Sequence, residues 1–163
     1  MKKVWLIMVL LLLLTGCGAG EFAPLLDVYA PEALPGPAQI TLSLPEEAGI
    51  EVFGGDTGRI YLCDGYSITV ETLSGGSIDS SLRQLTGYDS KSLTVLQRTE
   101  GSLQRYECAW TCAGEAGDQV GRAVVVDDGL YHYCVSVMAD ALDAGSLQAQ
   151  WQQILGSVNL RTG

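Results

Sequence analysis

The stretch YECAWTCAGEAGDQVGRAVVVDDGLYHYCVSV at residues 106–137 alternates apolar and polar residues around two glycine-containing turns. The pattern predicts three strands, at residues 103–112, 120–127 and 130–138, joined as an antiparallel meander. The second turn falls at Asp128-Gly129, a dipeptide that favours a two-residue hairpin loop. A sheet of this kind needs further strands and a covering layer to bury its apolar face.

The chain before the meander supplies more strands. Alternating apolar residues predict strands at residues 40–44, 59–63, 66–73 and 92–97. Asp64-Gly65 is expected to turn the second of these into the third. A short helix is expected at residues 77–86, with Gly87 as its stop signal.

The chain after the meander predicts a closing helix at residues 144–155. Leu147, Trp151, Ile154 and Leu155 fall at i, i+4, i+7 and i+8, which places them on one helix face. Residues 157–160 are expected to add a last short strand. The whole order predicts an α+β fold, a mainly antiparallel sheet with one short and one C-terminal helix packed on it.

Three segments carry a resemblance to a known fold: YSITV at residues 66–70, the meander, and WQQILGSVNL at residues 151–160. Their order resembles the PsbP-like fold, which photosystem extrinsic proteins share with bacterial lipoproteins of the DcrB type. The resemblance spans roughly residues 40–161. It implies the fold and a mostly non-enzymatic role, with no catalytic residues to carry over. The four cysteines of the domain depart from the family pattern.

The N-terminus has the features of an export signal. Lys2 and Lys3 precede an uncharged apolar run at residues 4–14, followed by Leu14-Thr15-Gly16-Cys17. The run is shorter than the roughly 20 residues of a membrane-spanning helix. Its last four residues resemble the lipobox of bacterial lipoproteins, which implies lipidation at Cys17. The chain is therefore expected on the extracytoplasmic face of the cell membrane, held by its N-terminal lipid.

These signals divide the chain into three parts. Residues 1–16 are the expected signal peptide, and residues 17–37 are the lipidated cysteine and a linker rich in proline, alanine and glycine. Four of the five prolines lie in that linker, and proline stiffens a chain towards extended geometry. Residues 38–161 are the expected PsbP-like domain.

Charge excludes one class of partner. The chain has 9 basic and 19 acidic residues, and loss of Lys2 and Lys3 with the leader changes its net charge from −10 to −12. Because nucleic acid repels an acidic protein, no nucleic-acid partner is expected.

No catalytic residue, cofactor or metal site is predicted. His132 is the one histidine of the chain, and a Ser-His-Asp mechanism needs a histidine beside both a serine and a carboxylate. Without an obvious partner in the sequence, His132 is interpreted as a packed histidine of a strand.

Four cysteines, Cys63, Cys108, Cys112 and Cys134, are the unusual feature of the domain. An even number in an exported chain favours disulfides, whereas free cysteines are common buried residues. Cys108 and Cys112 share one strand face at roughly 13 Å, which is too far for a disulfide. Pairing 63–108 with 112–134, pairing 63–112 with 108–134, and free thiols therefore stay open. The expected register also places Ala123 between Cys108 and Cys134.

These observations favour a non-catalytic binding or interaction module whose ligand is unknown. The alternative is a thiol-redox or metal-binding enzyme that uses the domain cysteines. Exposed cysteines beside a base would favour the enzyme, and cysteines buried under the last helix would favour the binding module.

Overall fold

The computed structural model describes residues 35–46, 50–55 and 57–161. The expected signal peptide, Cys17 and most of the expected linker lie outside the described residues. Gly36–Gly163 forms one compact unit, and the fold below is that of this unit. Within the described part of the chain, no helix is long and apolar enough to cross a membrane.

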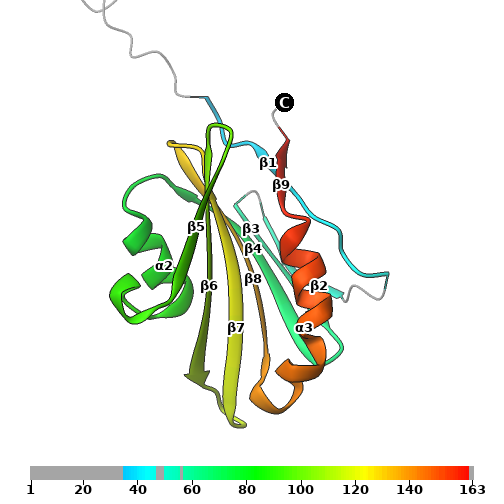
Figure 1. Cartoon of the computed structure of the whole chain (residues 1–163). Coiled ribbons are helices and arrows are strands. Elements are labelled where there is room, and N and C mark those ends of the chain that lie inside the picture. The colour runs from blue at the N-terminus through cyan, green and yellow to red at the C-terminus, as the bar shows by residue number, and fades with distance from the viewer. Residues whose placement is uncertain (1–34, 47–49, 56, 162–163) are drawn as a thin grey trace, which may run out of the picture. The chain divides into compact units, whose positions relative to one another are not determined.

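A seven-stranded antiparallel sheet is the frame of the domain (Figure 1). Its strands in spatial order are β2 (Ile50–Gly54), β3 (Gly58–Cys63), β4 (Tyr66–Ser74), β8 (Tyr131–Asp140), β7 (Asp118–Asp127), β6 (Leu103–Ala113) and β5 (Val95–Glu100). The short strands β1 (Gln39–Thr41) and β9 (Asn159–Arg161) form a separate antiparallel pair. The last strand of the meander, β8, pairs with β4 and lies in the middle of the sheet.

The two helices cover opposite faces of the sheet (Figure 1). Helix α3 (Ala141–Gly156) lies on one face, here called the α3 face, where Trp151 and Ile154 pack with alternate residues of β4, β7 and β8. Helix α2 (Ile78–Thr86) lies on the other, the α2 face, where Leu82 packs over β6, β7 and β8. A 3₁₀ turn, η2 (Ser90–Ser92), follows α2. The α+β fold predicted from the sequence is confirmed.

Local signals explain where several elements end. Cys63 pairs with Tyr66, so Asp64-Gly65 is the β3–β4 loop as predicted, with Gly65 at a φ of 76°. Gly87 ends α2 in the left-handed conformation at a φ of 78°, and its N–H donates to the carbonyl oxygen of Arg83.

The β7–β8 turn differs from the expectation by one residue. The N–H of Asp128 donates to the carbonyl oxygen of Tyr131 (3.3 Å), so the loop residues are Gly129 and Leu130. Gly129 has a φ of 89°, which suits the first position of a type II′ loop. The Asp128 carboxylate accepts from the N–H groups of Leu130 and Tyr131 and secures this loop.

The shifted turn moves the register of β8 by two residues. Ala123 pairs with Cys108 as predicted, but its neighbour on β8 is Ser136, and Cys134 pairs with Val125. Cys108, Ala123 and Cys134 therefore do not lie in one row. The expected row was wrong because the hairpin places its glycine at the first loop position.

Strand β2 was not predicted, and β5 begins three residues later than expected. The register of β2 shifts between Glu51 and Phe53, and this irregularity breaks the alternation that marks a strand. As an edge strand, β2 also leaves Val52 and Phe53 more than half exposed. At β5, the 3₁₀ turn at Ser90–Ser92 takes up the first residue assigned to the strand.

Candidate functional site

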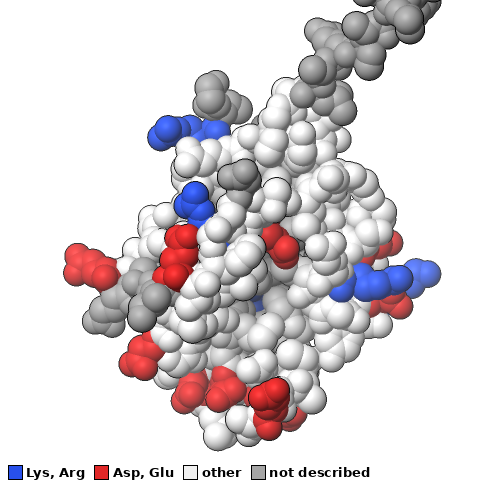
Figure 2. Space-filling view, turned by 180° about the vertical axis from the view of Figure 1, so that it is seen from behind, with Lys and Arg blue, Asp and Glu red and all other residues white. Residues whose placement is uncertain are grey.

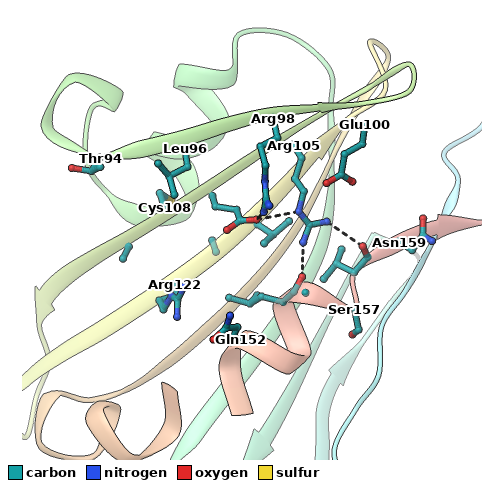
Figure 3. Close-up of a pocket in the computed structure, with 17 residues that line it drawn as sticks. Thr94, Leu96, Arg98, Glu100, Arg105, Cys108, Arg122, Gln152, Ser157 and Asn159 are labelled. Atoms are coloured by element: carbon teal, nitrogen blue, oxygen red, sulfur yellow. Dashed lines mark hydrogen bonds and ion pairs between the residues drawn. The ribbon is translucent and has the colours of Figure 1, made fainter. Parts of the chain in front are cut away.

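An open cavity of about 740 Å³ lies on the α3 face, between the C-terminal end of α3 and strands β5, β6 and β7 (Figure 3). The strands contribute Leu96, Arg98, Arg105, Arg122 and Val124 to its lining, among others. The chain from Gln152 to Asn159 forms the opposite side. The volume falls within the range of roughly 300–1,000 Å³ that small-molecule sites occupy.

Arg105 joins the floor of the cavity to the end of α3. Its side chain is only 6% exposed, and its guanidinium donates to the carbonyl oxygens of Leu155 (2.6 Å) and Val158 (3.2 Å). These acceptors belong to the last turn of α3 and the residues after it, where helix carbonyl groups lack partners within the helix. Arg105 therefore fixes the helix end that walls the cavity.

Glu107 neutralises part of the positive charge on the floor. It forms ion pairs with Arg98 and with Arg105, the latter at 3.3 Å between Nε and Oε1. Arg98 and Arg105 also face each other across β5 and β6. The carboxylate thus lets two guanidinium groups lie close together.

Arg122 differs from the other two arginines. It is half-buried and lines the cavity from β7, opposite the small residue Ala109 of β6. Within the described residues its side chain has no hydrogen-bond or ion-pair partner, in contrast to those of Arg98 and Arg105. The cavity therefore contains one guanidinium group with all its donors available.

The positive charge is concentrated at the cavity. Three of the six arginines of the chain line it, although the net charge is −10. Figure 2 shows several acidic side chains along the lower end of this face and others further up on both sides. The register brings three acidic segments together at the far end of the sheet: Asp64, the Glu115–Asp118 turn, and Asp140–Asp143. The cavity lining, with three arginines and two glutamates, therefore carries one net positive charge on an acidic protein.

The four cysteines of the domain are free thiols in the structure. Cys108 and Cys134 are buried on the α2 face, where Cys112 also packs, whereas Cys63 is half-buried on the α3 face. Cys108, Cys112 and Cys134 therefore lie under α2 and not under the last helix, because the alternation of β6 and β8 turns them towards α2.

The environment of the buried thiols suppresses their reactivity. Burial raises the pKa of Cys108 to about 11. Burial, with smaller contributions from Glu71 and Cys108, raises the pKa of Cys134 to about 12. Arg105 is directed towards α3, whereas the side chain of Cys108 packs on the α2 face. Since a working thiol needs a lowered pKa, this environment disfavours a redox role for Cys108 and Cys134.

Metal binding receives no support from the described residues either. Among them, no three His, Cys, Asp or Glu side chains lie close enough together to hold a metal ion. A different group of residues, around His132, resembles a catalytic triad, and the sequence did not predict the partners of this histidine.

His132 is buried between α2 and the β7–β8 hairpin, with 1% of its side chain exposed. Its Nδ1 and the hydroxyl of Ser81 share a hydrogen bond of 2.6 Å, and its Nε2 lies 3.6 Å from Oδ2 of Asp127. These are the residue types of a hydrolase triad. However, Ser81 is itself buried at 6% exposure, and none of the three lines the cavity. We therefore assign this set to holding α2 on the sheet.

Comparison with known proteins identifies the fold. No protein-family model and no curated protein matches the sequence. Among solved structures, a Bacteroides thetaiotaomicron protein has a TM-score of 0.53 at 11% identity, covering 76% of this chain and 45% of its own. LpqN of Mycobacterium tuberculosis, involved in cell envelope biogenesis, has a TM-score of 0.51 at 11% identity over 80% of this chain and 88% of its own.

The third similar structure carries the name of the fold. CyanoP, the cyanobacterial PsbP of Synechocystis, has a TM-score of 0.50 at 12% identity and covers 77% of this chain and 95% of its own. The domain has a PsbP-like fold. At such identities the likeness gives the fold alone and assigns no ligand. The chain spans less than half of the Bacteroides protein and most of the other two.

The arginines of the PsbP-like domain were not among the residues singled out in the sequence. Arg98, Arg105 and Arg122 lie on three strands and are spaced 7 and 17 residues apart in the chain. Only the antiparallel register brings them to one face, and only the end of α3 closes the cavity around them. Strand alternation alone indicates that residues 105 and 107 share a strand face, but it does not bring Arg98 or Arg122 to them.

Proposed function

We propose that this protein is a lipid-anchored extracytoplasmic binding module that takes up a small molecule in the cavity between α3 and strands β5–β7. The observation that carries the proposal is the cavity itself, about 740 Å³ in volume and lined by three arginines. Ligand sites are typically concave and mostly apolar, with a few polar groups that orient the ligand. The cavity combines such groups with the apolar side chains of Leu96, Val124 and Leu155.

The residues around the cavity are consistent with ligand binding without catalysis. Its lining contains no histidine, and of its two carboxylates Glu107 is engaged with Arg98 and Arg105, whereas Glu100 is exposed at the end of β5. A general base must be free to accept a proton from a bound substrate. The engaged carboxylate instead positions its arginines, which is the role expected in a binding site.

The membrane location rests on the sequence of the N-terminus. Lys2, Lys3 and the apolar run at residues 4–14 precede Cys17. Acyl chains on Cys17 would hold the protein on the membrane surface, since each buried methylene adds roughly 0.8 kcal/mol of affinity. In this proposal the linker at residues 17–37 presents the PsbP-like domain outside the cytoplasm.

Blocking the cavity tests the proposal. Ala109 is exposed and lines the cavity from β6, so Ala109→Trp introduces a large side chain without displacing core residues. Ala113→Trp is the matched control, because Ala113 is also exposed, lies at the end of the same strand and is outside the cavity lining. A panel of small molecules is then titrated against each full chain while amide chemical shifts are recorded.

We expect some members of the panel to shift amides of residues 96–98, 105–109 and 152–159 in the wild type and in Ala113→Trp. The same molecules should leave Ala109→Trp unchanged. Binding that is equal in both variants, or shifts confined to other parts of the domain, would contradict the cavity as the ligand site.

A further inference from the structure

We propose that the ligand of the cavity is a small amphiphilic monocarboxylate whose carboxylate pairs with Arg122. This inference rests on the proposed function, since it assigns a chemical class to the molecule that the cavity holds.

The three arginines are not equally available to a ligand. Arg105 already donates to two carbonyl oxygens at the end of α3 and to Glu107. Arg98 is paired with the same carboxylate. Arg122 has no such partner among the described residues, and its half-buried guanidinium lines the cavity. Because a guanidinium binds a carboxylate through two parallel hydrogen bonds, Arg122 supplies a complete carboxylate site.

The charge balance of the lining favours a single negative charge. Three arginines face two carboxylates, Glu100 and Glu107, in the cavity, which leaves one net positive charge. A monoanion neutralises that charge. A phosphate dianion would instead leave a negative charge near two carboxylates, and like charges in a partly desolvated site repel.

Apolar side chains form part of the surface beside Arg122, and Gln152 adds a polar one (Figure 3). Ala109 is the cross-strand neighbour of Arg122, Val124 follows two residues along the same face, and Leu155 lines the cavity from α3. Leu96 adds a large apolar side chain that is 63% exposed. An alkyl or aromatic body attached to the carboxylate would cover this surface, and each buried methylene contributes about 0.8 kcal/mol. The cavity therefore suits an anion that carries an apolar group.

Three probes with one alkyl chain separate the alternatives. Hexanoate carries one negative charge, hexanamide is neutral, and hexyl phosphate approaches two charges at neutral pH. Each is titrated against the full chain, with amide shifts of the cavity residues as the measure of binding. The short chain keeps all three probes in water, so partition into lipid does not distort their apparent affinities.

Two substitutions of Arg122 and one control complete the experiment. Arg122→Gln removes the charge, and Arg122→Lys keeps the charge but loses the two-pronged geometry. Neither leaves an unpaired group behind, because Arg122 has no partner among the described residues, so the fold should persist. Arg83→Gln is the control, since Arg83 is an exposed arginine of α2 on the other side of the sheet.

We expect hexanoate to bind more tightly than hexanamide and hexyl phosphate. Arg122→Gln should weaken hexanoate about tenfold, the lower end for a charge-assisted hydrogen-bonded pair, and leave hexanamide within about twofold. Arg122→Lys should fall between them, and Arg83→Gln should match the wild type.

The outcomes distinguish this inference from the proposed function. Equal binding of hexanamide and hexanoate, or tighter binding of hexyl phosphate, would overturn the monocarboxylate while leaving the cavity as a ligand site. Hexanoate binding that Arg122→Gln does not weaken would overturn the role of Arg122. Absence of binding by all three probes, together with no binder in the wider panel, would contradict the proposed function itself.

Discussion

Arg105 on β6 and Leu155 in the last turn of α3 are joined by a 2.6 Å hydrogen bond from the guanidinium to the carbonyl oxygen. The two residues are 50 positions apart in the chain. Their contact connects the sheet to the end of the helix, and it holds the wall and the floor of the cavity in a fixed relation.

Replacing Arg105 should therefore cost stability. Arg105→Leu leaves the carbonyl oxygens of Leu155 and Val158 without their donor and removes one cation from Glu107, so we expect a loss of about 3 kcal/mol in the free energy of unfolding. Urea denaturation followed by tryptophan fluorescence measures it. The exposed Arg83 is the control, and Arg83→Leu should change stability by less than about 0.5 kcal/mol. Similar losses for both variants would show that the Arg105 contact is unimportant.

A substitution at Gly121 tests the packing of the α2 face, and a substitution at Gly145 in α3 is its comparison. A Cβ at Gly121 would lie 2.3 Å from the ring of Trp110, which covers that glycine from β6. Gly121→Ala should therefore destabilise the domain by about 1–3 kcal/mol, the usual cost of overpacking. Gly145 lies within α3 with open space around it, and Gly145→Ala should stabilise by about 0.5–1 kcal/mol because alanine is the better helix former.

Opposite signs for the two glycine variants in the same thermal melts are the expected result. A neutral Gly121→Ala would mean that Trp110 does not pack on β7 as described.

The buried thiols predict a loss of stability at alkaline pH. An unfolded cysteine ionises near pH 8.5, whereas burial raises the pKa of Cys108 to about 11 and that of Cys134 to about 12. The folded state therefore binds more protons than the unfolded state between these values, so stability is fully present below about pH 8.5 and falls as pH rises towards 12. Urea midpoints measured from pH 7 to pH 11 follow this loss.

Replacing Cys134, the more deeply buried of the two thiols, shows how much of the stability loss at alkaline pH comes from that residue. Cys134→Ala should lower stability at pH 7, where the packing of the side chain is lost, and should make the decline above pH 9 shallower.

The buried thiols should also react slowly with a bulky thiol reagent. We expect the reagent to modify Cys108 and Cys134 slowly in the folded protein at pH 7 and quickly after denaturation. Rapid modification of either residue in the folded protein would support the thiol-redox alternative.

Cys17 is expected to carry the lipid anchor. Cys17→Ser should leave an unprocessed precursor, because the modification that precedes cleavage needs the thiol, and should abolish labelling by a fatty-acid probe. Cys63→Ser is the matched control and should be labelled like the wild type. Equal labelling of Cys17→Ser and the wild type would exclude the lipoprotein assignment.

Much of the fold followed from local sequence signals. Asp64-Gly65, Gly87 and the alternation of residues 106–137 predicted the β3–β4 loop, the end of α2 and the meander, because each depends on nearby residues alone. The β7–β8 turn was placed one residue early, since Asp128-Gly129 and Gly129-Leu130 are both acceptable loops. The Asp128 carboxylate, which accepts from Leu130 and Tyr131, selects the second.

The candidate site could not be predicted in the same way. Strand alternation alone accounts for Arg105 lying on the face opposite to Cys108. The hydrogen bond from Arg105 to Leu155, however, depends on how α3 packs on the sheet. The position of Arg98 depends on where β5 begins. The partners of His132 were missed for the same reason, because Ser81 reaches it from a helix 51 residues away.

Protein purified from the cells that produce it shows whether the cavity holds a ligand. Small molecules retained by the wild type, Ala109→Trp and Ala113→Trp are extracted and compared by mass spectrometry. We expect the wild type and Ala113→Trp to carry a molecule that is missing from Ala109→Trp and that has a carboxylate among its groups. Identical extracts from all three proteins would contradict this expectation.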